Sequence, residues 1–255
     1  MNASLSSHQA TFRDLLAAAL RADPARPLVT FYDDVTGERV ELSVTTYANW
    51  VAKTASLVQD ELDVEVGELA LVDLPTHWMG PVWLGALWSA GQVVTTDPSL
   101  AEEAALVVCG PAGVGRYGAL APSVPVVALS LRPLGAPFTE PLPPGVVDYG
   151  AVVLAQPDSF VPLDPPVPGD LAWRDLRGTT TQANLLGEAT APDFTRGGRL
   201  LTDVNPCSED GLGTLLSPLV HSGGTVWVAN PDEARWAQRR TEERVTADLR
   251  ATPPG

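Results

Sequence analysis

The sequence contains almost no lysine. Lys53 is the one lysine among 16 basic residues, and this preference for arginine is typical of bacterial genomes of high G+C content. Any mechanism that needs a lysine must therefore use Lys53 or a lysine of another chain. Basic residues are also outnumbered, since 31 acidic residues give a net charge of −15. This acidity argues against nucleic acid and against anionic membranes as partners, because both are bound through basic patches.

Cysteine and histidine are too scarce and too scattered to indicate a metal or redox site. Cys109 ends the apolar run AALVVC, Cys207 follows a proline, and neither belongs to a CxxC or CxxH pattern. We expect Cys109 to be a buried small hydrophobe. A nucleophilic role for Cys207 is conceivable, although no histidine lies close to it in sequence. The histidines are His8, His77 and His221. The sequence thus predicts no metal ligand set.

Long apolar runs are missing as well. No stretch reaches the roughly 18 uninterrupted apolar residues that a membrane-spanning helix needs. Segment 10–22 is apolar in its middle but carries Arg13, Asp14 and Arg21, so it predicts an amphipathic helix rather than a secretion signal. From these features we expect a cytoplasmic location.

What the sequence does contain is an alternation of helix-like and strand-like segments. Helical spacing of apolar residues predicts helices over 10–22, 45–62, 76–91, 97–104, 181–189, 209–223 and 232–249, with Thr45 or Thr46 as the N-cap of the second. Short apolar runs predict strands over 27–34, 35–43, 68–74, 92–96, 105–110, 124–131, 171–173, 198–204 and 224–230. Strands separated by helices predict an α/β fold with layered parallel sheets and flanking helices.

Proline divides this pattern into two parts. Residues 1–160 are predicted to form a first α/β subdomain, and the proline-rich segment 161–169 a seam. Residues 170–248 are predicted to form an incomplete second α/β subdomain, followed by a tail over 249–255.

The order of these segments resembles the N-terminal region of the adenylate-forming (AMP-binding) enzymes, which include acyl-CoA synthetases. The matching pieces of the first half are Thr46–Tyr47, Gly67–Pro75, Leu84–Gly91 and Val93–Pro98. In the second half the match covers RLLTDVNPCSEDGLGTLLSPLVHSGGTVWVA, residues 199–229. The resemblance implies a fold like a truncated N-terminal domain of such an enzyme.

Between the two matches the family carries a phosphate-binding loop similar to TSGTTGxPKG. Gly178, Thr179 and Thr180 supply its GTT letters and are the candidate nucleotide-binding residues. TQANL, residues 181–185, fits the helix start that follows the loop. With that helix aligned, the intervening segment is too short to hold the other glycines, the proline and the lysine. With GTT aligned, Thr181, Ala183 and Asn184 replace them. The alternative interpretation is that one of Thr179, Thr180 and Thr181 simply caps a helix.

Two other motifs permit a functional and a structural interpretation. The helix after LPTHWMG gathers His77 and Trp78, Trp83 and Trp88, which would suit either an acyl-sized pocket or a core helix whose preceding loop His77 caps. The glycine-rich segment 109–118 contains one GxGxxG register, a weak dinucleotide signal; we interpret it as an ordinary strand–helix turn.

Function follows from what the loop lacks. Adenylyl transfer depends on positioning and on stabilising spread negative charge, and this loop has neither the lysine nor the glycine cradle. The segments that carry the family's adenine, ribose and catalytic-lysine motifs have no counterpart either. We therefore expect a non-catalytic homologue, with no catalytic residue and no cofactor, that binds a ligand or a protein. Two alternatives stay open: acyl or aryl adenylation with ATP and magnesium, completed by another chain, or a structural subunit of an oligomer.

Overall fold

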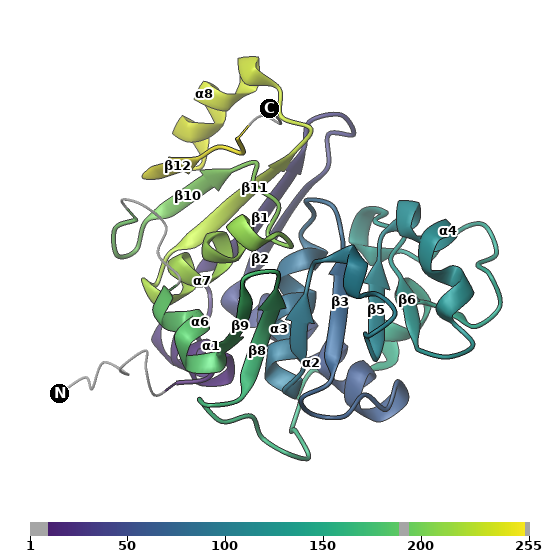
Figure 1. Cartoon of the computed structure of the whole chain (residues 1–255). Helices are drawn as coiled ribbons and strands as arrows, with labels where there is room; N and C mark the ends of the chain where they lie inside the picture. Colours follow the sequence, from purple (N-terminus) through teal and green to yellow (C-terminus); the bar gives the residue numbers. More distant parts are fainter. Residues whose placement is uncertain (1–9, 189–193, 253–255) are drawn as a thin grey trace.

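Two largely parallel sheets form the framework of the protein. A computed structural model describes residues 10–188 and 194–252. The five-stranded sheet has the order β12-β10-β11-β1-β2, and the seven-stranded sheet the order β7-β6-β5-β3-β4-β8-β9 (Figure 1). The strands are β1 Pro27–Asp33, β2 Arg39–Ser43, β3 Leu69–Asp73, β4 Val93–Thr95, β5 Leu106–Cys109, β6 Val126–Ala128, β7 Val146–Asp148, β8 Leu171–Asp175, β9 Gly178–Thr181, β10 Arg199–Thr202, β11 Gly224–Ala229 and β12 Ala247–Leu249.

Within the described residues, only the hairpins β1–β2 and β8–β9 pair antiparallel; the other neighbours run parallel. The helices are α1 Phe12–Ala22, α2 Val44–Ser56, α3 Met79–Ala90, α4 Val114–Tyr117, α5 Tyr149–Val152, α6 Gln182–Glu188, α7 Leu212–Val220 and α8 Glu233–Glu242. The predicted α/β class with layered parallel sheets and flanking helices is confirmed.

Local capping explains where the first helices begin. Thr11 and Asp14 form a reciprocal capping box at the start of α1. The predicted cap of α2 is wrong: Ser43, not Thr45 or Thr46, accepts the N–H of Thr46 at 3.1 Å. Serine is preferred because it reaches the free N–H groups of the first turn from an extended backbone.

Two predicted helices differ from the structure. Segment 97–104 forms only a short 3-10 turn, Pro98–Leu100. The single helix predicted over 232–249 is wrong, because α8 stops at Glu242 and Arg244 adopts a left-handed φ of 52°. The chain then continues as β12, which pairs with β10. Pairing with a distant strand thus overrides a helical pattern in the sequence. The ends of the predicted helix 181–189 and tail 249–255 lie outside the described residues.

A layer of helices lies between the two sheets. Helix α2 packs on β1, β2 and α3, and α3 packs in turn on β3 and β4. Every residue of α3 is buried, including Trp83 and Trp88, as expected for a core helix. One hydrophobic cluster includes side chains of both sheets and of this layer. The two sheets therefore share a core.

Each sheet takes strands from both sides of the proline-rich segment 161–169. Strands β1 and β2 join the C-terminal β10, β11 and β12, while β8 and β9 extend the sheet formed by β3 to β7. Gln182, completely buried at the start of α6, adds a further link. Its Oε1 accepts the N–H of Phe12 at 3.0 Å, and its Nε2 donates to the carbonyl of Trp88 at 3.0 Å. The predicted subdomain limits stay a prediction.

Candidate functional site

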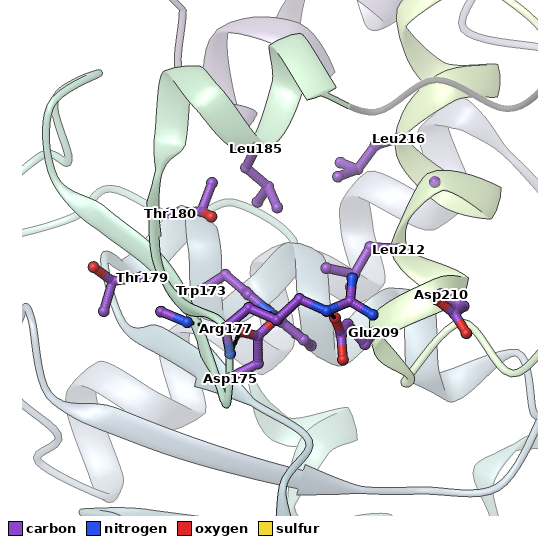
Figure 2. Close-up of a pocket in the computed structure, with 12 residues that line it drawn as sticks. Trp173, Asp175, Arg177, Thr179, Thr180, Leu185, Glu209, Asp210, Leu212 and Leu216 are labelled. Carbon is purple, nitrogen blue, oxygen red and sulfur yellow. Dashed lines mark hydrogen bonds and ion pairs between the residues drawn. The ribbon is translucent and has the colours of Figure 1, made fainter.

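The candidate nucleotide-binding residues line a cleft of about 400 Å³. The β8–β9 hairpin forms one wall, and α6 and the beginning of α7 form the others (Figure 2). Its lining consists of Trp173, Asp175, Arg177, Gly178, Thr179, Thr180, Leu185, Glu209, Asp210, Leu212, Gly213 and Leu216. The structure thus brings the GTT segment together with residues more than twenty positions further along the chain.

The turn between β8 and β9 is organised around one carboxylate. Oδ1 of Asp175 accepts the backbone N–H of Arg177 at 2.7 Å and that of Gly178 at 3.1 Å, and Oδ2 accepts Nε1–H of Trp173 at 2.9 Å. Aspartate commonly bonds to the backbone N–H groups that follow it in such turns. The N–H groups at the start of the GTT segment therefore point at an anion that belongs to the chain itself.

The ionisation of Asp175 reflects this surrounding. Burial on its own would raise the pKa of the carboxyl group. The hydrogen bonds from Trp173, Arg177 and Gly178, with the positive charge of Arg177, outweigh burial and hold the pKa below its ordinary value. Asp175 is thus negatively charged at neutral pH.

The GTT residues belong to a strand. Gly178, Thr179 and Thr180 lie in β9 opposite Asp175, Arg174 and Trp173 of β8. Figure 2 shows Thr180 on the side of Leu185 and Thr179 on the other side of the strand. The hydroxyl of Thr181 accepts the N–H of Asn184 at 3.3 Å at the start of α6. The interpretation of Thr181 as a helix cap is confirmed. Nucleotide binding by the three GTT residues stays a prediction.

The rest of the cleft combines carboxylates with an apolar floor. Nε of Arg177 lies 2.5 Å from Oε1 of Glu209, so the arginine is paired. Asp210 is exposed and makes no ion pair within the described part of the chain. Leu185 points from α6 towards the gap between α6 and α7, where Leu212 and Leu216 approach it from α7 (Figure 2). Three carboxylates and one arginine thus surround a leucine-lined surface.

Sequence reasoning missed most of this lining. The acidic side chains Asp175, Glu209 and Asp210 were not predicted as site residues, because the hairpin and α7 meet only in the folded chain. The one local signal is the spacing of Asp175 and Gly178 in DLRG, which is typical of a turn stabilised by aspartate. No group of three or more His, Cys, Asp or Glu side chains in residues 10–188 and 194–252 is placed to hold a metal ion.

The remaining reactive side chains lie elsewhere. Nζ of Lys53 pairs with Asp158 at 3.1 Å and donates to the carbonyl of Gln156, away from the cleft. Cys109 and Cys207 are both buried, and burial raises the pKa of each thiol, to about 12 for Cys109. Burial and the raised pKa therefore argue against a nucleophilic Cys207, since the thiolate is the reactive form.

His77 has the capping role that the sequence suggested. Its Nδ1 accepts the N–H of Met79 at 3.2 Å, at the start of α3. The ring packs against Phe31, with ring centroids 4.8 Å apart. His8 lies outside the described residues.

Comparison with known proteins places the chain in a family. No family model matches it. A protein of Mycobacterium tuberculosis (strain ATCC 25618 / H37Rv), named "TIGR03089 family protein", is 37% identical over 240 residues, which are 92% of this chain and 96% of that protein. The chain belongs to the TIGR03089 family. The similarity between the two proteins thus covers nearly all of each sequence.

Solved structures show which fold this TIGR03089 chain has. An acyl-CoA synthetase of Brucella canis superposes with a TM-score of 0.76 and 15% identity, over 95% of this chain and 47% of that one. A candidate long-chain-fatty-acid CoA ligase of Rhodopseudomonas palustris CGA009 gives a TM-score of 0.75 and 19% identity, over 96% of this chain and 64% of that one. The expected resemblance to part of an acyl-CoA synthetase is confirmed for the fold, and the chain spans 47% and 64% of these two proteins.

None of the helices in the described residues combines the length and the apolar character that crossing a bilayer requires.

Proposed function

We propose that this TIGR03089-family protein binds a small ligand in the β8–β9 cleft and does not itself activate a carboxylate with ATP. The supporting observation is the position of Asp175. A triphosphate bound at the GTT segment would need the N–H groups of Arg177 and Gly178, which already donate to that carboxylate. The nucleotide would have to displace a charged group that is fixed in the same turn.

Electrostatics add to this competition. Asp175, Glu209 and Asp210 line the cleft, and Arg177 is already paired with Glu209. Two like charges about 4 Å apart repel by about 1 kcal/mol in water and by about 4 kcal/mol near a protein surface. A tetra-anionic ligand would meet this repulsion several times, without a lysine to offset it. Phosphoryl and adenylyl transfer depend on the opposite arrangement, in which cations surround the phosphates.

The shape and lining of the cleft suit a different kind of ligand. Its volume of about 400 Å³ lies within the range of small-molecule sites. Leu185, Leu212 and Leu216 are 6%, 8% and 1% exposed, so they offer the ligand only a small apolar floor. The carboxylates at the rim favour an uncharged or positively charged head group. We therefore expect an amphipathic molecule whose uncharged or cationic end meets the carboxylates and whose apolar part contacts the exposed edges of these leucines.

Calorimetry with the purified chain tests the negative half of the proposal. Titration with ATP and magnesium should give no saturable heat, and incubation with fatty and aromatic carboxylic acids should release no pyrophosphate. Micromolar ATP binding would contradict the proposal and favour the adenylating alternative. Pyrophosphate release with any carboxylic acid would refute it.

A pair of matched probes tests the positive half. Octylamine and octanoate share an apolar chain and differ in the charge of the head group. Methyl NMR signals of Leu185, Leu212 and Leu216 should shift saturably with octylamine and much less with octanoate. Replacing Asp210 by asparagine should narrow that difference. Equal responses to both probes, or none to either, would contradict the assignment of this cleft as the ligand site.

A further inference from the structure

Exposed apolar side chains gather in one segment of the chain. Within the described residues nine large aliphatic side chains are exposed, and five of them belong to residues 154–171, which we call the strap. They are Leu154, Val161, Leu163, Val167 and Leu171. Apolar residues scattered singly are normal on a protein surface, whereas a group of them in one place marks a surface that binds a partner.

The strap is fixed in position, although these side chains face the solvent. Pro162 and Pro166 are buried and anchor its middle. Between them, the N–H of Leu163 donates to Oε1 of Gln59 at 2.9 Å, in the π-helical turn Leu57–Glu61 that follows α2. An anchored segment loses little conformational entropy when a partner binds. Its exposed side chains are therefore already placed for contact.

Uncompensated negative charge surrounds these apolar side chains. Asp164 is exposed on the strap itself, and Asp60 and Glu61 are exposed in the π-helical turn that the strap contacts. None of the three forms an ion pair with a residue in the described part of the chain. Glu61 accepts one hydrogen bond, from the amide of Gln156.

The cations next to the strap are fewer and already have partners. Nζ of Lys53 lies 3.1 Å from a carboxylate oxygen of Asp158, and the guanidinium of Arg13 lies over the ring of Phe160, 5.7 Å from its centroid. The strap also carries Asp170, so five carboxylates stand against two cations. The charge of this surface thus favours a positively charged partner.

The prolines of the strap restrict how a partner can bind. Residues 162, 165, 166 and 168 are proline and have no backbone N–H, so a partner strand cannot form a regular ladder along the strap. Contact must therefore come from side chains. Val161 and Val167 are six residue steps apart, at most about 20 Å along the chain. This is the length of a helix of about 14 residues.

We propose that the strap is the docking surface for a basic amphipathic helix of another protein. The apolar stripe of that helix covers Val161, Leu163 and Val167, and lysine or arginine beside the stripe pairs with Asp164 and Asp60. A second copy of this chain fits poorly, because its net charge is −15 and two straps facing each other would bring like charges together.

The test uses two synthetic peptides of about 14 residues as probes, both with leucines at helical spacing. One carries lysine at the polar positions and the other glutamate. Calorimetry with the full-length chain should show saturable binding of the lysine peptide, at least about tenfold tighter than that of the glutamate peptide and weakened by salt. Equal affinity for the two peptides would overturn the proposal. So would the absence of saturable binding of the lysine peptide at millimolar concentration.

Paired substitutions locate the binding. Val161→Ser combined with Leu163→Ser should weaken the lysine peptide about tenfold or more, since these side chains are buried only in the complex. Val35→Ser combined with Leu176→Ser is the matched control and should leave the affinity unchanged. The exposed fractions are 79% and 86% in the first pair and 78% and 88% in the second, and the control residues lie in the β1–β2 and β8–β9 turns. Equal weakening by both pairs would show that the peptide binds without a site, and the proposal would be wrong.

Light scattering of the chain alone, at rising concentration, tests the other occupant. Self-association that Val161→Ser with Leu163→Ser abolishes would assign the strap to a second copy and would overturn the proposal. Because the strap is separate from the β8–β9 cleft, its failure as a docking surface would leave the proposed function standing.

Discussion

Removal of the Asp175 carboxylate should destabilise the protein by about 2 kcal/mol. The side chain accepts three hydrogen bonds, from Nε1 of Trp173 and from the N–H groups of Arg177 and Gly178. A hydrogen bond to a charged group contributes about 1.5–3 kcal/mol when it is buried. Two of these three lie in an exposed turn, where water replaces the lost partner, so the sum for Asp175→Ala is discounted to about 2 kcal/mol. Asp175→Asn keeps an acceptor and should lose about half as much.

The effect should also depend on pH, in a direction that the lowered pKa fixes. The folded-state pKa of Asp175 lies below the unfolded value of about 3.9. Its contribution to the free energy of unfolding is therefore complete above that value and is lost as the pH falls through the folded-state pKa. The difference between the natural chain and Asp175→Ala should be constant from pH 5 to 7 and should shrink below about pH 4.

Urea unfolding at several pH values, together with thermal unfolding, measures both predictions. A loss of about 2 kcal/mol corresponds to a melting temperature lower by about 4–8 °C in a chain of this size. Asp210→Ala is the control, because that exposed carboxylate lines the same cleft, and its effect should stay within about 0.5 kcal/mol. If Asp175→Ala changes stability no more than the control does, the turn is not held by Asp175, and the argument against a phosphate at this position fails with it.

Three further outcomes follow from the core. Gln182→Leu should lower the free energy of unfolding, measured in urea, by about 2–5 kcal/mol, because it leaves the buried N–H of Phe12 and the buried carbonyl of Trp88 without partners. A loss below about 1 kcal/mol would mean that both groups find new partners. Gly85→Ala places a methyl group 2.4 Å from a buried tyrosine hydroxyl and should cost about 1–3 kcal/mol, whereas Gly115→Ala, with no neighbour within 4 Å, should be neutral or slightly stabilising. Equal effects of the two alanines would contradict this packing. Cys109 and Cys207 should react with a thiol reagent only after denaturation, since both are buried with raised pKa values; rapid labelling of the folded chain would show that one of them is accessible.

Local sequence patterns predicted individual helices and strands better than they predicted which strands pair with each other. Helix α3 was predictable because its apolar residues run all round and Gly91 follows in the left-handed conformation that ends many helices. Strand β9 was not predictable, since GTTT has no alternation of apolar and polar residues. It pairs with β8 across a turn that Asp175 stabilises. Strand β12 was hidden within a helical pattern for a similar reason, because its partner β10 lies far earlier in the sequence.

The candidate site divides in the same manner. The sequence alone shows the GTT letters and the absence of a lysine beside them. It therefore also predicts that this segment binds phosphate poorly. The carboxylates of α7 and the leucine floor cannot, because they reach the hairpin only through the packing of α6 and α7. Neither could a second cleft, of about 830 Å³ where the two sheets meet, be predicted, since its lining comes from the ends of five strands that are far apart in the chain.

The sequence by itself determined the alternation of helices and strands, the buried central helix and the scarcity of positive charge, because each depends on residue type and on spacing along a few turns. Only the tertiary structure decided which strands share a sheet, where Asp175 directs its carboxylate, and that His77 and Glu38 line one cleft. These depend on contacts between segments that are separated by many residues, and on the free energy of packing them together, which no local pattern records.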